Sequence, residues 1–200
     1  MSSQNHIAII ADQVGSRRSP DAVPHALTEL ASVPAVLSFE RTAGDEIQGL
    51  VPDGAAAVEA ILRLWRLGEW SIGIGIGEVE APLPASTREA RGPAYLAARG
   101  AIEEAEGVAA RLRIDAADSA ARDAETVLRL AEPLVHGRSA ATWQALELAH
   151  AGLTQQQIGE QLGITQGAVS RRLARAYDAE IQRASELGAR LIDTARTGGS

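Results

Sequence analysis

The chain has 200 residues and a formal net charge of −7, and 46% of its residues are hydrophobic and 22% charged. These values are ordinary for a soluble globular protein of one large or two small domains, and they exclude a chain that is disordered or collagen-like throughout. The sequence contains no cysteine, which excludes disulfides, thiolate metal sites and cysteine nucleophiles.

The distribution of charge and hydropathy sets further limits. Residues 1–138 hold 13 arginines and 20 acidic residues, whereas residues 139–200 hold six of each. Every basic residue is arginine, which excludes a P-loop lysine and a lysine Schiff base. The aliphatic runs are far shorter than the roughly 18 apolar residues of a membrane helix, and the N-terminus lacks a signal-peptide layout. The sequence therefore predicts a cytoplasmic protein without membrane spans.

The first two thirds alternate between strand-like and helix-like segments separated by Gly, Pro and Asp-Gly breaks. We expect strands over residues 6–12, 35–42, 46–51, 70–80 and 108–114, and helices over residues 21–31, 54–68, 93–106 and 119–135, the last ended by Pro133 and Gly137. The first six elements run in the order βαββαβ. This order predicts an α+β fold, a ferredoxin-like or palm domain over residues 1–137 with an antiparallel sheet and helices on one face.

The strand over residues 70–80 carries isoleucines on one face and Gly73, Gly75 and Gly77 on the other. A bare glycine face allows a helix to pack closely on the sheet, or it can cradle phosphate. We favour helix packing, because no helix begins at the place that a phosphate cradle needs.

Residues 138–200 are expected to be entirely helical and to form a second domain. The segment LTQQQIGEQLGITQGAVSRRL fits a helix-turn-helix, with Thr154 and Gln157 as a capping box and Gly163 in the left-handed turn conformation. Gly159 allows the two helices to cross closely. The apolar residues Ile158, Leu162, Ile164, Val169 and Leu173 would form a small shared core.

The second helix of this motif leaves polar residues exposed that suit contacts with double-stranded DNA. The candidates for base edges and phosphates are Gln166, Gly167, Ser170, Arg171, Arg172 and Arg175, and no acidic residue lies within residues 161–177. The alternatives are a helical hairpin with a solvated arginine face, and a helix-turn-helix that contacts only proteins. Trp143 belongs to a preceding support helix and is expected to pack in the core.

An apolar stripe continues beyond the motif, formed by Ile181, Ala184, Leu187 and Leu191 at helical spacing. Such a stripe packs either on the chain's own domain or on a partner subunit. The second option would give a homodimer suited to paired DNA half-sites.

Three carboxylates are predicted to meet at one side of the sheet. Asp12 ends the first strand, and Asp45 and Glu46 occupy the tip of the β-hairpin. The plain alternative is a polar turn beside a strand end. Hard divalent cations such as Mg²⁺ bind carboxylate oxygens together with phosphates, so the cluster also suits a metal-bound nucleotide.

These motifs together resemble known families. AGDEIQG (43–49) with SIGIGIGEV (71–79) is similar to the GGDEF diguanylate cyclase pattern, and GPAYLAARGAIE (92–103) resembles class III nucleotide cyclases. Taken with IIADQVGSR and the helix-turn-helix, they resemble the SatD family over nearly the whole chain. The resemblance implies a palm domain in which Asp12 and Asp45 hold Mg²⁺ and in which Glu46, Arg17, Arg18 and Arg99 contact the nucleotide.

The sequence departs from the cyclase patterns at three positions, one of which is Ile47 in place of the phenylalanine of the hairpin motif. Ala43 replaces the first glycine of the hairpin motif, and Tyr95 replaces an asparagine of the cyclase helix. Loss of such groups leaves binding easier to retain than chemistry. The sequence therefore favours a DNA-binding regulator that senses a nucleotide or divalent metal. The alternatives are a nucleotidyl cyclase or related enzyme, in which Glu46 and Arg99 would be catalytic, and a non-catalytic adaptor.

Overall fold

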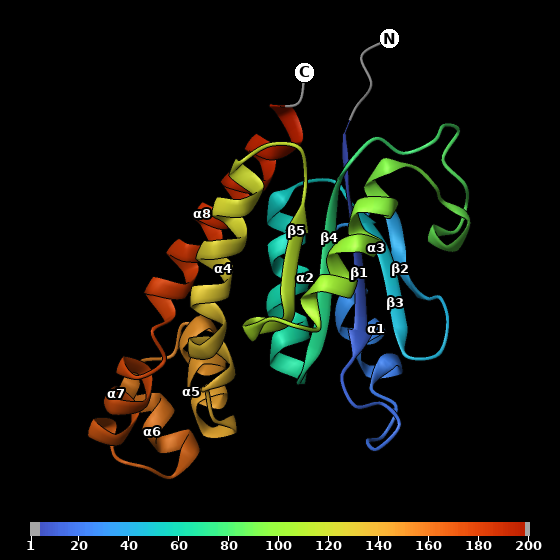
Figure 1. The fold of residues 1–200 in the computed structure, drawn as a ribbon. Coiled ribbons are helices and arrows are strands. Elements are labelled where there is room, and N and C mark those ends of the chain that lie inside the picture. The colour runs from blue at the N-terminus through green and yellow to red at the C-terminus, as the bar shows by residue number, and fades with distance from the viewer. Residues whose placement is uncertain (1–4, 199–200) are drawn as a thin grey trace.

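A computed structural model describes residues 5–198, and Figure 1 shows its two parts: a body built on a β-sheet and a small helical head. The strands are β1 (His6–Gln13), β2 (Leu37–Arg41), β3 (Glu46–Val51), β4 (Trp70–Gly77) and β5 (Leu112–Asp115). The body helices are α1 (Val23–Leu30), α2 (Gly54–Leu67), α3 (Pro93–Ala105), α4 (Ala120–His136) and α8 (Asp178–Thr197), and the head helices are α5 (Ala140–His150), α6 (Gln155–Leu162) and α7 (Gln166–Ala174).

The sheet has the strand order β2-β3-β1-β4-β5. The β1 strand lies between β3 and β4 and is antiparallel to both, whereas β5 joins β4 in parallel at the edge. The first six elements follow the predicted order βαββαβ, and the hairpin strand β3 has the predicted bounds. The chain is therefore of mixed α+β class, with a five-stranded sheet followed by a helical region.

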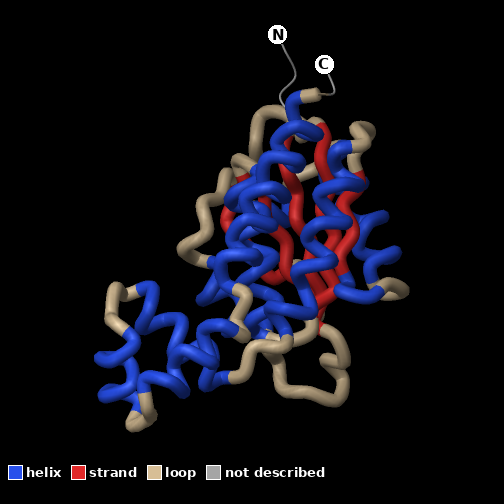
Figure 2. The backbone as a smooth tube through the Cα atoms, turned by 90° about the vertical axis from the view of Figure 1, so that its left-hand side faces the viewer, coloured by secondary structure: helices blue, strands red, loops and turns tan. Residues whose placement is uncertain are grey.

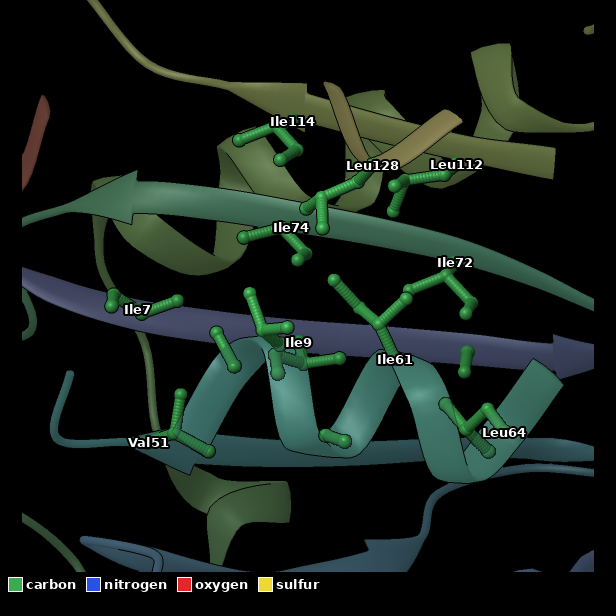
Figure 3. Packing of buried hydrophobic residues seen from close by; sticks show 14 of the residues in the cluster. Ile7, Ile9, Val51, Ile61, Leu64, Ile72, Ile74, Leu112, Ile114 and Leu128 are labelled. Carbon is green, nitrogen blue, oxygen red and sulfur yellow. The ribbon is translucent and has the colours of Figure 1, made fainter. Parts of the chain in front are cut away.

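Helices cover both faces of the sheet, so the predicted single helical layer is wrong. Figure 3 shows the larger core, where Ile9, Ile74 and Ile61 meet between the sheet and α2. On the opposite face Ala8 and Ile10 pack against α3. Side chains alternate along a strand, so each face of β1 is apolar and each attracts its own layer of helix.

The glycine face of β4 has the packing role that we favoured from the sequence. A methyl group added to Gly75 would lie 2.0 Å from the backbone oxygen of Ala94 in α3, and one added to Gly73 would lie 2.4 Å from that of Ala98. Side chains on this face would push α3 away from the sheet. The glycines thus bring the backbones of α3 and β4 into contact.

Helix α4 ends at His136, one residue beyond the predicted range of residues 119–135, with Pro133 inside its last turn. Proline removes only one backbone donor, and its position in the last turn leaves little helix to disturb. The amide of Gly137 donates to the carbonyl of Pro133 at 2.9 Å and closes that turn.

The last helix, α8, returns from the head and packs against α4 and α2 in the body (Figure 1). Ile181 and Ile192 join the larger core, and the amide of Gly54 donates to the Asp193 carboxylate at 3.0 Å. Within the apolar stripe of this helix, Ile181 is buried in the core of its own chain and Leu191 packs against that core, whereas Leu187 is exposed. A homodimer stays a prediction, and this stripe no longer supports it.

The head projects from the end of the body opposite the chain termini, as Figure 2 shows. Its helices enclose a separate small core around Ala145, Ile158 and Val169. Among the described residues 5–198, no helix is long and apolar enough to cross a membrane.

Candidate functional sites: a helix-turn-helix and a carboxylate cavity

Local hydrogen bonds fix both ends of the turn in the head. Thr154 caps α6 by accepting from the amide of Gln157 at 3.3 Å, and the Gln157 side chain accepts from the amide of Thr154 at 2.8 Å. This reciprocal pair is the predicted capping box. Thr165 caps α7 in the same way, through the amide of Ala168 at 3.2 Å. The caps satisfy backbone donors that would otherwise lack partners at the start of each helix.

Two glycines set the angle between the helices. Gly163 ends α6 in the left-handed conformation at φ 66°, as the sequence predicts, and its amide donates to the Gly159 carbonyl. A methyl group on Gly159 would lie 2.8 Å from the Ile164 backbone oxygen, so this position needs glycine for the close approach. The turn is therefore determined by residues that are adjacent in sequence.

The five apolar residues predicted for the head core all lie in it or pack against it. Ile158 and Val169 are completely buried. Ala145 of α5, also completely buried, completes the core. Three short helices thus enclose one small apolar cluster, and α7 is held with its other face outward.

The outward face of α7 carries the predicted DNA contacts. Gln166, Gly167, Ser170, Arg171 and Arg175 are exposed, and Arg172 is half-buried. Within residues 5–198, no carboxylate forms an ion pair with any of these three arginines. Their guanidinium groups are therefore available to an external anion.

The head is joined to the body by a polar contact that sequence reasoning missed. Arg138 is almost fully buried and donates to the carbonyl of Ala176 at 2.8 Å and to the carboxylate of Asp178 at 3.0 Å. Its guanidinium lies 4.7 Å from the ring centre of Trp143, which also packs against the body core. The contact joins residues about 40 positions apart, so no local pattern signals it.

At the end of β1, part of the predicted carboxylate site assembles around a cavity of about 470 Å³. Asp12, Asp45, Arg17 and Arg18, four of the residues selected from the sequence, all line it. Glu106 and Arg111 also line it, although sequence reasoning did not select them. Arg111 follows a short turn after α3 and adopts φ 43°, a conformation that no sequence signal predicts.

The carboxylates of this cavity affect one another. Burial, and then the charge and hydrogen bonding of Asp45, raise the pKa of Asp12 to about 6. Glu46 and Glu106 add to the effect at longer range. Part of the Asp12 population therefore holds a proton near neutral pH, and a cation placed between Asp12 and Asp45 would relieve the repulsion.

Glu46 and Arg99 lie outside the cavity and bind each other. Arg99 donates through both terminal nitrogens to the Glu46 carboxylate, and Thr42 donates to the same carboxylate at 2.5 Å. Partial burial alone would raise the pKa of Glu46, but the bonds from Arg99 and Thr42 outweigh it, so this pKa lies below its ordinary value. The predicted three-carboxylate cluster thus becomes a pair, Asp12 and Asp45.

Two further observations bear on the metal and enzyme predictions. In the part of the chain that the structure describes, no group of three or more metal-ligating side chains comes together.

Tyr95, which replaces the cyclase asparagine, is buried, and its hydroxyl lies 3.1 Å from that of Thr87. Tyr95 therefore has a packing and hydrogen-bonding role between α3 and the preceding loop.

Comparison with known families gives one result. The family model of Sigma-70, region 4, a helix-turn-helix DNA-binding region, matches residues 140–179. The match spans the three head helices and the start of α8. Comparisons with curated proteins and with solved structures found no match. The C-terminal region therefore contains a helix-turn-helix similar to this DNA-binding region.

Proposed function

We propose that this protein is a transcriptional regulator that reads a specific sequence of double-stranded DNA with α7. The observation that carries the proposal is the outward face of α7. Its three arginines form no ion pair with the described residues, and the inner face and turn of the motif fit a helix-turn-helix. Similarity of residues 140–179 to Sigma-70, region 4, supports the same function.

In this proposal α7 lies in the major groove. Gln166, Ser170 and Arg171 near its middle and N-terminal end are suited to base edges, because amide, hydroxyl and guanidinium groups match their donor and acceptor patterns. Arg172 and Arg175 toward the C-terminal end are suited to phosphates, which fix the register without reading sequence. The body then orients the head through the Arg138 contact.

Binding of the full chain to a duplex selected from a random library tests the proposal. We expect affinity to fall steeply as salt increases, because bound arginines release counterions from the phosphates. Arg175→Ala should reduce the slope of log affinity against log salt by about one unit. Arg183→Ala, an exposed arginine of α8 outside the head, is the matched control. Failure to select any duplex would leave the protein-contact adaptor as the better interpretation.

A second function is favoured by the cavity at the end of β1, where three carboxylates and three arginines line the same space. We propose that a nucleotide binds here with Mg²⁺, which Asp12 and Asp45 would hold while Arg17 and Arg18 contact the phosphates. The βαββαβ order with β1 between β3 and β4 supports a palm-like body of the kind that the SatD resemblance implies. Regulation by a bound nucleotide would then give the body a sensing role.

The melting temperature of the full chain with Mg²⁺ and each nucleoside triphosphate tests this second function. A ligand that binds only the folded state must raise the melting temperature. Asp45→Asn should abolish the increase, whereas Asp115→Asn, at an exposed position outside the cavity, should preserve it. No increase with any triphosphate, with Mg²⁺ or Mn²⁺, would overturn the sensing proposal. Formation of a cyclic or linear nucleotide product in the same mixtures would instead support the enzyme alternative.

A further inference from the structure

A second cavity, of about 390 Å³, lies where the head meets the body, between α2, α4, α5 and α8. Its apolar lining is provided by Leu62, Val135, Trp143 and Ile181. The volume falls in the range of small-molecule sites, which are mostly apolar with a few polar groups and often occur between domains. None of the residues predicted for DNA or nucleotide binding lines this cavity.

One buried polar atom of the lining has no hydrogen-bond partner among the described residues. The hydroxyl oxygen of Ser185 is shielded from solvent, and no described residue forms a hydrogen bond with it. Buried polar atoms are nearly always hydrogen-bonded, because an unmade bond costs about 1–3 kcal/mol. A rotation of the Ser185 side chain about χ1 would turn this oxygen into the cavity, where a polar group of a bound molecule would supply the missing partner.

The charges of the lining favour a cation. Three arginines line the cavity, and each already has a carboxylate partner: Arg63 pairs with Glu59, Arg66 with Glu147, and Arg138 with Asp178. Glu186 is the lining carboxylate for which the described residues provide no cationic partner. An anion entering the cavity would meet guanidinium groups already in use, whereas a cation would meet this unpaired carboxylate.

We propose that the head–body cavity is a binding site for a small, largely apolar organic cation, with Glu186 matching its charge and Ser185 meeting a polar group. The site lies at the joint that orients the DNA-reading helix. One face of α5 contributes Ala145 to the head core, and another contributes Trp143 to the cavity and the body core. A molecule held here touches both parts of the protein. The proposal depends on neither DNA nor nucleotide binding.

Fluorine NMR of the full chain labelled with 5-fluorotryptophan tests the site, because its three tryptophans give three signals and only Trp143 lines this cavity. The probes are benzyltrimethylammonium, benzyl alcohol and phenylacetate, which share a phenyl ring and differ in charge. Trp143→Phe assigns the signal. We expect the cation to shift the Trp143 signal in a saturable way and to bind more tightly than the alcohol, with phenylacetate weakest.

Glu186→Gln should weaken the cation roughly threefold to fivefold, the upper range for a solvent-accessible ion pair, and should leave the alcohol unchanged. Glu180→Gln, an exposed position of α8 outside the cavity, is the matched control and should change neither. Ser185→Leu fills the space and should abolish the shift for all three probes. Equal binding of cation and anion, or an unmoved Trp143 signal at high millimolar cation, would overturn the proposal.

Discussion

The head and the carboxylate cavity show two different ways of building a site. In the head, the groups that shape the turn are satisfied by neighbours within a few residues, such as Thr154 and Gln157, and the exposed arginines cost the fold little. In the cavity, Asp12 comes from β1 and Asp45 from the turn before β3, and burial together with the repulsion between them raises the pKa of Asp12 to about 6. The exposed arginines of the head therefore have little effect on the stability of the folded protein. In the cavity, in contrast, the repulsion between the two carboxylates destabilises the folded protein when no ligand is bound.

This difference concerns the free energy of the unliganded protein. Water solvates the arginines of α7, so removing one should weaken DNA binding and leave the free energy of unfolding nearly unchanged. The carboxylates of the cavity are partly desolvated, so removing one should increase the free energy of unfolding and weaken any cation binding. Substitutions in the two regions should therefore differ in their effect on the free energy of unfolding. It should stay nearly constant for the arginines of α7 and increase for the carboxylates of the cavity.

The largest effect is expected in the small core of the head. Ile158 is completely buried among the three head helices, and Ile158→Ala should lower the free energy of unfolding of the head by about 2–4 kcal/mol. Hydrogen exchange measured along the chain should show faster exchange in α6 and α7, with little change in β1 and β4. Ala168→Gly, at a partly exposed position of α7, controls for general helix weakening of about 1 kcal/mol. Equal loss of protection in the sheet would show that the head does not open as a separate unit.

The next effect concerns DNA affinity. Arg171→Ala should weaken binding to the best duplex by about 1–3 kcal/mol and relax selectivity at one base position, because a bidentate base contact is worth that much. Its melting temperature should stay close to that of the parent, because Arg171 is exposed and forms no ion pair with any described residue. A competition assay over single-base variants of the duplex measures both quantities. Undiminished affinity would remove this part of α7 from the interface.

A smaller loss is expected at the turn between α6 and α7. Gly163 adopts φ 66°, and Gly163→Ala should lower the free energy of unfolding by about 1 kcal/mol because a side chain resists the left-handed conformation. There is space around this glycine, so the loss would come from the backbone and not from a collision. Gly163→Asn should recover part of it, since asparagine tolerates this conformation better. Urea unfolding followed by circular dichroism measures the series.

The same contrast explains how far the sequence predicts the structure. Caps, turn glycines and the apolar positions of the head are local signals, and the structure bears out each of them. The strand and helix order of the body is equally local in origin, and so is the bare face of β4 that receives α3. The error concerns a relation between distant segments, the second helical layer. The packing of α8, which the sequence left open, depends on a relation of the same kind.

The candidate site in the body was predictable only in part for the same reason. Convergence of Asp12 and Asp45 follows from the hairpin and the strand order. Glu46 pairs with Arg99 of α3 instead of lining the cavity. This pairing depends on the position of α3 over the sheet, and no residue spacing in the sequence specifies that position. Arg111 reaches the cavity through an unusual backbone conformation next to β5. Side-chain partners set by tertiary packing are therefore the part that sequence patterns leave undetermined.

The smallest expected effect on stability comes from the repulsion between Asp12 and Asp45. Because Asp12 has a raised pKa in the folded state, the folded protein holds a proton between pH 4 and 6 that the unfolded chain releases. The contribution of Asp12 to stability therefore falls as pH rises through this window, and its cost is fully present at pH 7. Asp45→Asn removes one neighbouring charge while burial persists. We expect it to lower the pKa of Asp12 and to stabilise the fold at pH 7 by only about 0.5 kcal/mol, since solvent screens the pair.

Below about pH 4 this difference between parent and variant should vanish, because Asp12 is then protonated in the folded state of both proteins and carries no charge for Asp45 to repel. Urea unfolding of the two proteins at pH 4, 5, 6 and 7 measures the difference, and a carboxyl-carbon NMR titration of Asp12 measures the pKa directly. Asp115→Asn serves as the reference for removing an exposed carboxylate of the same sheet. A variant that is less stable than the parent at pH 7 would show that Asp45 is a structural turn residue. The carboxylates of the cavity would then not destabilise the fold, and the cavity would not differ from the head in this respect.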